Sequence, residues 1–406
     1  MNKEKLVPQL RFKGFEGEWE KNKLNNVAIV KDGTHESPRK VGEGYPLITS
    51  KNLKNNKIDF SDVSYISKKD FNHINDRSKV DIGDILFGMI GTIGNPVRVS
   101  SDDFAIKNVA LIKYYSLDSL FTLFLLQSGS FTNYIKKSNV GNTQKFISLN
   151  NIKKFSFLMP LEQEQQKIGS FLKKIDKLIE LQEKKMNHNY IMKNFYIQNI
   201  IPSRNSSYPT LRFKGLETLW VKQLVDQLVH FNNGISGDVK LNGGRYKLTR
   251  IETISKEFVD ITKLGFTNSK PSAEKILKKG DILFSNINSI EHIGKMAVFN
   301  LEIPIYHGIN LLRMSPINNV NPYFIFYTLS KQEYKNWIIS RSNKAVSQAS
   351  INKSTLGNLD LLVPGYDEQN KIANFLTKID KLIYFRKQKI EHLKQLKKGY
   401  LQKLFC

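Results

Sequence analysis

The sequence predicts a mixed α/β protein with two homologous α/β domains joined by two long helices. One stretch is written twice: residues 164–179 read EQQKIGSFLKKIDKLI and residues 368–383 read EQNKIANFLTKIDKLI, with 12 of 16 positions identical. Shorter motifs repeat in the same order around it. Apolar runs of strand length also alternate with amphipathic runs of helix length. At 406 residues the chain is too long for one core and suffices for two domains of about 150 residues.

Each repeated stretch begins a long helix. A proline (Pro160, Pro364) and an acidic, Gln-containing turn precede it, as is typical of a helix start. Apolar residues then recur at alternating spacings of three and four, which is typical of a coiled-coil seam. We expect helices of about 35–40 residues, packed antiparallel because the second copy must return its domain to the opposite end. The candidate seam residues are Ile168, Leu172, Ile175, Ile179, Ile372, Leu376, Ile379 and Ile383.

The duplication extends well beyond the helices. Pro8–Gly14 (PQLRFKG) reappears as Pro209–Gly215 (PTLRFKG), and Gly83–Phe87 (GDILF) reappears as Gly280–Phe284. Long tandem copies with a shared frame and divergent middles indicate two homologous domains rather than a solenoid of short repeats. The expected organisation is a first domain at 1–160, a first helix at 161–201, a linker at 202–209, a second domain at 210–364 and a second helix at 365–406.

Within each copy the pattern predicts both strands and helices. β-branched apolar runs bounded by Gly, Asn and Asp predict strands. In the first copy these are Tyr45–Thr49, Asp84–Phe87, Val109–Tyr114 and Phe155–Met159. Leu117–Lys136 and its counterpart Pro322–Ser340 have helical periodicity, so we expect one amphipathic helix in each.

The composition favours a polyanionic partner. The net charge is +25, which suits nucleic acid; lysines on solvated helix faces of a lysine-rich protein would give the same charge. The one cysteine, Cys406, allows neither a disulfide framework nor a cysteine-based metal site. With no signal peptide at the N-terminus and no apolar run of membrane-spanning length, we expect a cytoplasmic protein without a membrane partner.

Catalytic motifs are weak or absent. Phe12–Gly17 resembles the glycine loop of an adenosylmethionine site, but its duplicate loses the second glycine. Asn321–Phe324 resembles the tetrapeptide of amino-methyltransferases but lacks the second proline, so a helix-start proline is the better interpretation. Asp367 and Glu368 fit first-turn acids favoured by the helix dipole. There is no P-loop, no His-Glu-x-x-His motif and no metal-ligand spacing, and we expect no catalytic residue and no metal.

The loops that differ between the copies form a candidate recognition surface. Residues 31–40 (KDGTHESPRK) and 142–145 (NTQK) combine amide or hydroxyl groups with cations, and Arg245, Lys247 and Arg250 follow a glycine pair. Asn and Gln can bind adenine bidentately, Arg and Lys can bind guanine, and further cations bind phosphates. Ordinary solvated loops remain the alternative. Gln144 has a counterpart in the second copy, Gln348, although the surrounding loops differ. We therefore expect these two glutamines to act in recognition or to make a structural hydrogen bond.

Taken together, these motifs resemble the DNA-specificity subunit of a type I restriction-modification system. The resemblance rests on Pro-x-Leu-Arg-Phe with a following Trp in each half, the Gly-Asp-Ile-Leu-Phe and Gly-Thr-Ile-Gly elements of residues 83–94, the Gln144 region and the repeated helices. It covers essentially the whole chain. The second copy departs from it where Ser285–Gly294 replaces the Gly-Thr-Ile-Gly element.

The resemblance implies two target-recognition domains related by a pseudo-two-fold duplication, each reading half of a bipartite double-stranded DNA site. The helices would set the spacing and dock two methyltransferase subunits, and restriction (translocase) subunits would complete an ATP-dependent nuclease and adenine methyltransferase. S-adenosylmethionine, ATP and magnesium would be bound by those partners. The candidate DNA contacts are Lys31, Thr34, His35, Arg39, Lys40, Thr92, Asn142, Thr143, Gln144, Lys145, Asn233, Lys240, Arg245, Lys247, Arg250, Asn286, Asn288, Ser347 and Gln348.

Two other functions stay open at this point. One is a self-sufficient DNA methyltransferase or nuclease, which would transfer methyl groups without partner subunits. The other is a basic coiled-coil scaffold that binds nucleic acid without sequence preference, which bulk DNA would compete away from a specific duplex.

Overall fold

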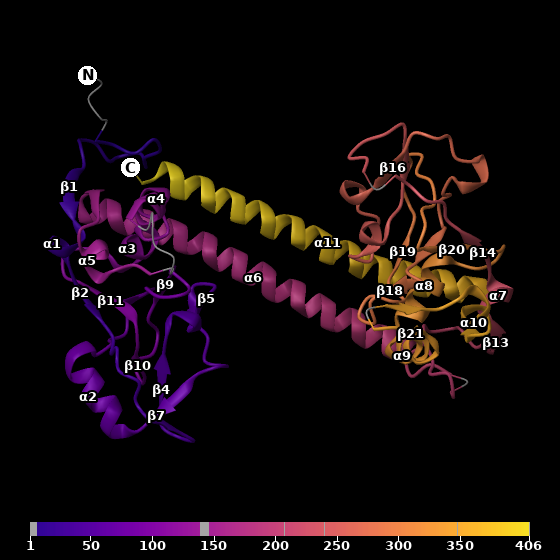
Figure 1. Cartoon of the computed structure of the whole chain (residues 1–406), viewed down its shortest axis with the longest axis horizontal. Helices are drawn as coiled ribbons and strands as arrows, with labels where there is room; N and C mark the ends of the chain where they lie inside the picture. The colour runs from indigo at the N-terminus through magenta and orange to yellow at the C-terminus, as the bar shows by residue number, and fades with distance from the viewer. Residues whose placement is uncertain (1–5, 139–145, 207, 239, 347, 406) are drawn as a thin grey trace. The chain divides into compact units, whose positions relative to one another are not determined.

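The computed structural model describes residues 6–138, 146–206, 208–238, 240–346 and 348–405. The chain forms two compact units: unit 1 is Met1–Glu183 with Gln388–Cys406, and unit 2 is Lys184–Lys387. Helices α6 (Glu162–Ile200) and α11 (Tyr366–Lys403) are each divided between the units (Figure 1). They contain 39 and 38 residues, so the two long helices predicted from the repeated stretch are present.

Unit 1 is built on an antiparallel four-stranded sheet of order β2-β11-β8-β9. Its strands are β2 (Ala28–Asp32), β11 (Val109–Tyr114), β8 (Ile85–Gly88) and β9 (Gly94–Arg98). A second sheet has the order β10 (Ala105–Ile106), β4 (Tyr45–Ile48), β7 (Ser64–Ile66) and β3 (Lys40–Val41). Two short pairs complete the unit: β1 (Glu20–Lys23) with β12 (Ser156–Met159), and β5 (Leu53–Lys54) with β6 (Lys57–Ile58). The four strands predicted for the first copy are confirmed to within a residue or so at their ends.

The helices of unit 1 are short apart from α6. They are α1 (Leu24–Val27), α2 (Lys68–Ser78), α3 (Ser119–Leu125), α4 (Gly129–Ser138) and α5 (Leu149–Lys153), with a 3₁₀ turn at Ser50–Asn52. The prediction of one helix over Leu117–Lys136 is wrong, because the chain breaks between α3 and α4. Ser128 accepts a hydrogen bond from the amide of Phe131 at 3.3 Å, so this serine caps the new helix α4.

Unit 2 repeats the main sheet as β14 (Val229–Asn233), β20 (Leu312–Pro316), β17 (Ile282–Phe284) and β19 (Met296–Val298) in the same antiparallel order. Its other strands are β13 (Val221–Leu224) with β23 (Asp360–Val363), β15 (Tyr246–Leu248) with β16 (Gly265–Thr267), and the sheet β18 (Ile287–Asn288), β22 (Ala349–Ser350), β21 (Asn343–Lys344). Residues of β17 alternate between two cores. Ile282 and Phe284 belong to the core that also contains residues of α8 and both long helices, whereas Leu283 belongs to a second core with Leu277 and Phe299.

The helices of unit 2 are α7 (Val225–Leu228), α8 (Pro322–Ser330), α9 (Gln332–Arg341) and α10 (Lys353–Gly357), with 3₁₀ turns at Ile251–Ile254, Ile261–Lys263 and Ala273–Lys275. Pro322 opens α8 and Asn321 caps it, as the helix-start interpretation predicted. The prediction of a single helix over Pro322–Ser340 is wrong, since it breaks at Lys331. This lysine is buried and its Nζ donates to the carbonyl of Ile201 at 2.8 Å, a partner 130 residues away.

Helices α6 and α11 lie antiparallel in each unit, and the same contacts occur twice with the helices exchanged. In unit 1 Asp176 pairs with Lys397 at 2.6 Å, and in unit 2 Lys193 of α6 pairs with Asp380 of α11 at 2.8 Å. The two lysines are separated by 204 positions in the sequence, and so are the two aspartates, so these residues are equivalent in the two copies. The candidate seam residues are all buried, with side chains 0–8% exposed.

The duplicated Arg-Phe motif and the duplicated Glu-Gln pair meet in the structure. Arg11 donates two hydrogen bonds to Glu164 at 2.9 and 2.8 Å, and Arg212 donates two to Glu368 at 2.9 and 2.7 Å. Both carboxylates lie in the first turn of a long helix, as expected, and are nearly inaccessible. The hydrogen bonds to Glu368 raise the pKa of Arg212, so its guanidinium group remains protonated.

The glutamine that follows each glutamate joins the long helix to a shorter one. The side chain of Gln165 accepts from the amide of Asp118, which caps α3, and that of Gln369 accepts from the amide of Asn321, both at 2.9 Å. Each glutamine also donates to the carbonyl of the preceding proline at 3.0 Å. The repeated Glu-Gln pair therefore seats the N-terminus of each long helix on its own domain.

Candidate nucleic-acid interface

The divergent loops of unit 1 gather at one end of the main sheet. Asp32 at the end of β2 lies opposite Ala110, and Gly88 at the end of β8 lies opposite Val109 at the start of β11. Because neighbouring strands are antiparallel, the loops after β2 and after β8 meet at the edge where β11 begins. These are the loops that contain the candidate residues between Lys31 and Lys40 and Thr92.

The first loop is held in place by a buried carboxylate. Asp32 accepts hydrogen bonds from Arg77 and from His35 Nε2, the latter at 2.7 Å. Burial disfavours the charged form of Asp32, but the hydrogen bonds from His35 and Arg77 outweigh it and lower its pKa below the ordinary value. The other ring nitrogen of His35 lies 2.7 Å from Asn108 Oδ1. Both nitrogens of His35 are thus engaged within the domain.

The other candidates of this loop are more accessible. The side chains of Arg39 and Lys40 are exposed and make no hydrogen bond or ion pair with any residue that the structure describes. Lys31 donates to the carbonyl of Arg77 at 3.2 Å. The amide of Thr34 donates to the carbonyl of Ile106, and the carbonyl of Thr34 accepts from the amide of Asn108. These two hydrogen bonds fix the start of the loop to the sheet edge.

A chain of hydrogen bonds joins this loop to the next. Ser50 Oγ donates to the carbonyl of Asn108 at 3.2 Å and accepts from the amide of Met89 at 3.1 Å. The carbonyl of Thr92 folds back over Gly88, where a Cβ atom would lie only 2.4 Å from it. Only glycine fits at that approach, and Thr92 is left exposed at the loop.

The third candidate segment of unit 1 borders the same loop. Ile90 forms a bridge with Phe146, and the amide of Ile147 donates to the carbonyl of Met89 at 2.9 Å. The candidates Asn142, Thr143, Gln144 and Lys145 lie outside the described residues. The residue that directly follows them, Phe146, is nevertheless anchored to the loop of Thr92.

Unit 2 makes the same connection with a different sequence. The amide of Ile351 donates to the carbonyl of Asn286 at 2.9 Å, as Ile147 does to Met89. β18 pairs with β22 so that Asn288 lies opposite Ala349, next to Gln348. The segment that replaces the Gly-Thr-Ile-Gly element therefore occupies the same place in the fold. The side-chain amide of Asn288 donates to Ser285 Oγ at 3.1 Å and accepts from the backbone amide of Ser289 at 2.9 Å, whereas Gln348 is exposed. Ser347 lies outside the described residues.

The basic loop of unit 2 divides into exposed and packed cations. Lys240, Arg245 and Lys247 are exposed, as is Asn233 at the end of β14. Arg250 is half-buried, and its guanidinium lies over Gly265, where a Cβ atom would come within 2.3 Å of Nε. The structure thus separates Arg250 from the exposed cations, because its side chain covers a neighbouring turn.

Sequence reasoning missed Asn108 and its counterpart Asn310. Both precede the central strand of the main sheet and adopt a positive φ, 54° and 65°, a conformation that asparagine tolerates better than most residues. Their recurrence in both copies was a usable signal. Buried His307 at the same end of unit 2 was also missed; its Nε2 lies 2.9 Å from the carbonyl of Leu311, and burial lowers its pKa to about 4.

The described residues contain no cluster of three or more His, Cys, Asp or Glu side chains suited to hold a metal ion. None of the described helices combines the length and apolarity needed to cross a membrane.

The comparison with known families assigns the chain. The family model described as type I restriction modification DNA specificity domain matches residues 16–188 and again residues 220–395. The chain belongs to this family. The two matches correspond to the two copies recognised in the sequence, so the specificity-domain resemblance is confirmed for both halves, including the half that lacks Gly-Thr-Ile-Gly.

Individual relatives agree with the specificity-domain assignment. The chain is 40% identical over 190 residues to a protein of Methanocaldococcus jannaschii named as the type I restriction enzyme MjaX specificity subunit. That alignment covers 46% of this chain and 45% of the relative, so less than half of either is compared.

Solved structures extend the likeness in fold to the whole chain. The S subunit of a type I restriction-modification system from M. genitalium matches with a TM-score of 0.64 at 16% identity, covering 98% of this chain and 99% of the other. A second chain, from a study of complex assembly in a type I restriction-modification system, matches with a TM-score of 0.57 at 16% identity, covering 94% and 96%. The mixed α/β fold with duplicated specificity domains is therefore confirmed.

Proposed function

We propose that this chain is the DNA-specificity subunit of a type I restriction-modification complex, in which each domain reads one half of a bipartite double-stranded site. The observation that carries the proposal is the pair of homologous sheet ends. Equivalent backbone contacts, Ile147 to Met89 and Ile351 to Asn286, support loops whose sequences differ. Two different half-sites require this combination of a shared frame and divergent side chains.

The charge of the chain supports a DNA partner. Arg39, Lys40, Lys240, Arg245 and Lys247 are exposed on or beside the divergent loops, and the net charge is +25. Such cations bind phosphates whatever the sequence, whereas an exposed amide such as that of Gln348 can distinguish bases. We assign the candidate contacts to these two roles, with His35, Arg250 and Asn288 positioning the loops.

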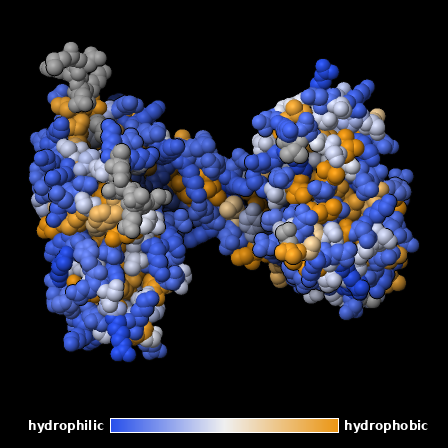
Figure 2. Space-filling model, viewed as in Figure 1, coloured by the Kyte–Doolittle hydropathy of each residue, from blue (hydrophilic) through white to orange (hydrophobic). Residues whose placement is uncertain are grey.

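The long helices are proposed as spacer and docking surface. Exposed apolar side chains occur at equivalent positions of the two copies: Leu178 and Leu181 are 48% and 43% exposed on α6, and Leu382 and Phe385 are 47% and 65% exposed on α11. An apolar pair repeated at an offset of 204 suits two copies of one partner. Hydrophilic residues otherwise predominate on the visible face of unit 1 (Figure 2).

The proposed partners are two methyltransferase subunits and the restriction (translocase) subunits. We assign methyl transfer to adenine and ATP-dependent cleavage to these partners, with S-adenosylmethionine, ATP and magnesium bound there. The chain itself is proposed to be non-catalytic and to act in the cytoplasm, where its DNA substrate lies.

The test is methylome mapping of cells that carry the chain with its methyltransferase partner. We expect a bipartite adenine-methylated motif. Gln348→Ala should relax only the half-site read by unit 2, because each good bidentate contact discriminates by about 1–3 kcal/mol.

The matched control is Asn358→Ala, an exposed asparagine after α10, which packs on α7 at the start of β14, the opposite end of the sheet. This control should leave the motif unchanged. Equal relaxation of both half-sites by the loop variant, or methylation by the chain without a partner, would overturn the proposal.

A further inference from the structure

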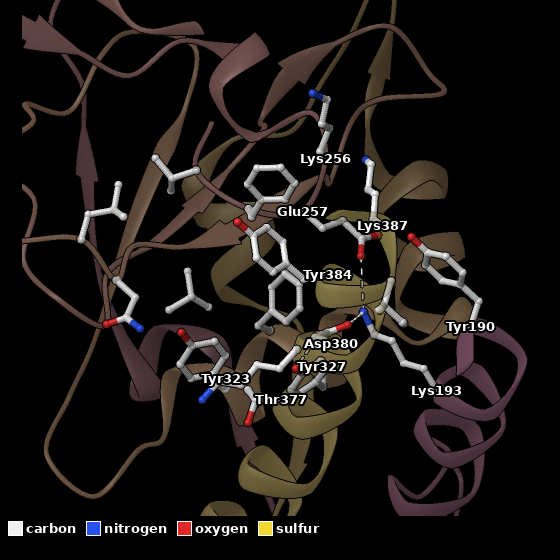
Figure 3. A pocket seen from close by; sticks show the side chains of 18 residues that line it. Tyr190, Lys193, Lys256, Glu257, Tyr323, Tyr327, Thr377, Asp380, Tyr384 and Lys387 are labelled. Carbon is white, nitrogen blue, oxygen red and sulfur yellow. Dashed lines mark hydrogen bonds and ion pairs between the residues drawn. The ribbon is translucent and has the colours of Figure 1, made fainter. Parts of the chain in front are cut away.

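Unit 2 contains a cavity of about 410 Å³ between α6, α11 and the second domain (Figure 3). Tyr190 comes from α6, Tyr384 from α11, and Phe258 and Tyr323 from the second domain. The volume lies within the range of small-molecule sites, which are mostly apolar and aromatic with a few polar groups. None of these residues belongs to the divergent loops at the sheet end.

The floor of the cavity is a closed polar network. Lys193 Nζ lies 2.8 Å from Asp380 Oδ1 and 5.6 Å from the centre of the Tyr327 ring, and Tyr327 donates to Asp380 Oδ2 at 2.6 Å. Lys193 is 7% exposed, and Glu257 lies 3.5 Å from it. Figure 3 shows these side chains converging below the aromatic walls. The buried ammonium group of Lys193 is therefore paired with two partly exposed carboxylates, so it is not free to bind an anionic ligand.

The rim carries the charge that a ligand would meet. The side chains of Lys381 and Lys387 are exposed and form no hydrogen bond or ion pair with other residues in the described part of the chain. Lys256 lies at the same rim and pairs with Asp260 at 3.1 Å. Unpaired ammonium groups beside aromatic walls favour a ligand that is both planar and anionic.

Unit 1 has the same fold but different residues at two positions that line the cavity in unit 2, so the fold does not require an aromatic ring and a lysine there. The positions equivalent to Tyr384 and Lys387 hold Glu180 and Glu183. Glu180 pairs with Lys57 and Glu183 pairs with Lys394, each at 2.7 Å. The first copy therefore uses these positions for ion pairs, whereas the second copy places an aromatic ring and a free lysine there.

We propose that the cavity of unit 2 binds a small planar heteroaromatic molecule with an anionic group, of the nucleoside monophosphate class. The ring would lie against Tyr190 and Tyr384, and the anionic group would bind Lys381 and Lys387. The walls belong to both long helices and to the second domain, so the bound molecule stabilises the seating of that domain on the helices. This is an effector site, separate from the proposed DNA contacts.

The test is isothermal titration of the full chain with AMP, with adenosine and inorganic phosphate as separate probes of the ring and of the anion. AMP should bind, and each fragment should bind about tenfold more weakly or worse. Tyr384→Ala and Lys387→Gln should each weaken AMP binding about tenfold, because both groups are exposed and contact the ligand without supporting the core. Tyr366→Ala is the matched control: it lies on the same helix at 45% exposure, against 51% for Tyr384, and does not line the cavity.

Several results would overturn the proposal. They are no binding of AMP to the full chain, unchanged binding in the Tyr384→Ala variant, or inorganic phosphate binding as tightly as AMP. Displacement of AMP by a short DNA duplex would assign it to the DNA interface and also refute the effector site. Retention of AMP in a saturated complex with DNA supports it.

Discussion

Loss of the arginine that anchors each long helix should destabilise the two units unequally. Glu368 is 2% exposed and its two hydrogen bonds come from Arg212, which is itself largely covered. Arg212→Met leaves a buried carboxylate unpaired, which costs about 3–5 kcal/mol. In unit 1 Arg11→Met removes the equivalent pair from Glu164, but Trp19 Nε1 still donates to that carboxylate at 3.2 Å.

The retained indole bond sets the expected difference. A hydrogen bond to a charged group contributes about 1.5–3 kcal/mol, so we expect Arg11→Met to cost about 2 kcal/mol and Arg212→Met about 4 kcal/mol. Trp220, the counterpart of Trp19, cannot compensate, because its Nε1 has no hydrogen-bond partner in the described structure.

Native-state hydrogen exchange provides the measurement, since it reports the opening free energy of each unit separately. The amide of Leu172 reports on unit 1 and that of Leu376 on unit 2. Arg11→Met combined with Trp19→Phe is the control, and it should bring the loss in unit 1 up to that of Arg212→Met. Equal losses in the two single variants, or a change at Leu376 caused by Arg11→Met, would show that the buried pairs do not act as described.

Three further predictions follow from the site and the helices. Burial lowers the pKa of His307 to about 4, below its ordinary value near 6.5, so the unfolded chain binds the extra proton between these values. The free energy of unfolding of unit 2 should therefore fall by about 2 kcal/mol from pH 7 to pH 5, and His307→Gln should remove that fall in urea titrations; a variant that keeps it would contradict the assignment. The logarithm of DNA affinity of the assembled complex should fall by about 0.9 per neutralised phosphate for each unit of log salt concentration, as measured by fluorescence anisotropy, whereas a flat response would exclude phosphate contacts by the exposed cations. Seven residues inserted after Glu183 and seven after Lys387 preserve the helical phase and add about 10 Å to each helix; methylome mapping should then show a gap between half-sites longer by about three base pairs, and an unchanged gap would rule out the helices as the spacer.

The parts of the fold that could be predicted are those with a local signal. The long helices follow from an apolar period sustained over many turns, and β11 follows from a β-branched run, so both were recognised with nearly correct ends. The duplicated frame was visible because each motif kept its order. Family membership could be expected from the same motifs, without any three-dimensional information.

The breaks within the shorter helices could not be predicted, because tertiary contacts decide them. Lys331 reads as an ordinary helical residue in the sequence. Its ammonium group is buried against the carbonyl of Ile201, and reaching that partner turns the chain between α8 and α9. The arginine partners of Glu164 and Glu368 could not be predicted either, because each lies more than 150 residues away in the sequence.

The sequence predicted which loops form the candidate interface, but it did not predict where these loops lie in the folded domain. Divergent sequence indicated where the loops are, and strand register then brought them to one end of each sheet. Polar composition alone could not separate His35, with both ring nitrogens engaged, from exposed Arg39. That distinction depends on Asp32, at the end of β2, and Asn108, directly before β11, neither of which was a candidate.

A comparison of the two copies shows which positions are constrained by packing and which can vary. Where the two copies keep the same residues, as in Asp176 and Asp380, the structure shows the same contact twice, so a substitution there acts on helix packing. Where equivalent positions differ, as in Glu180 and Tyr384, the helix continues unchanged and the residue faces a different neighbour. Differences of this kind at the sheet ends can alter the bases that are read, and those on the helices can give one unit a ligand site that the other lacks. Exchanging Glu180 and Tyr384 between the copies should therefore leave the preferred DNA site unchanged while weakening AMP binding in unit 2, and a change in the DNA site would show that the two surfaces are coupled.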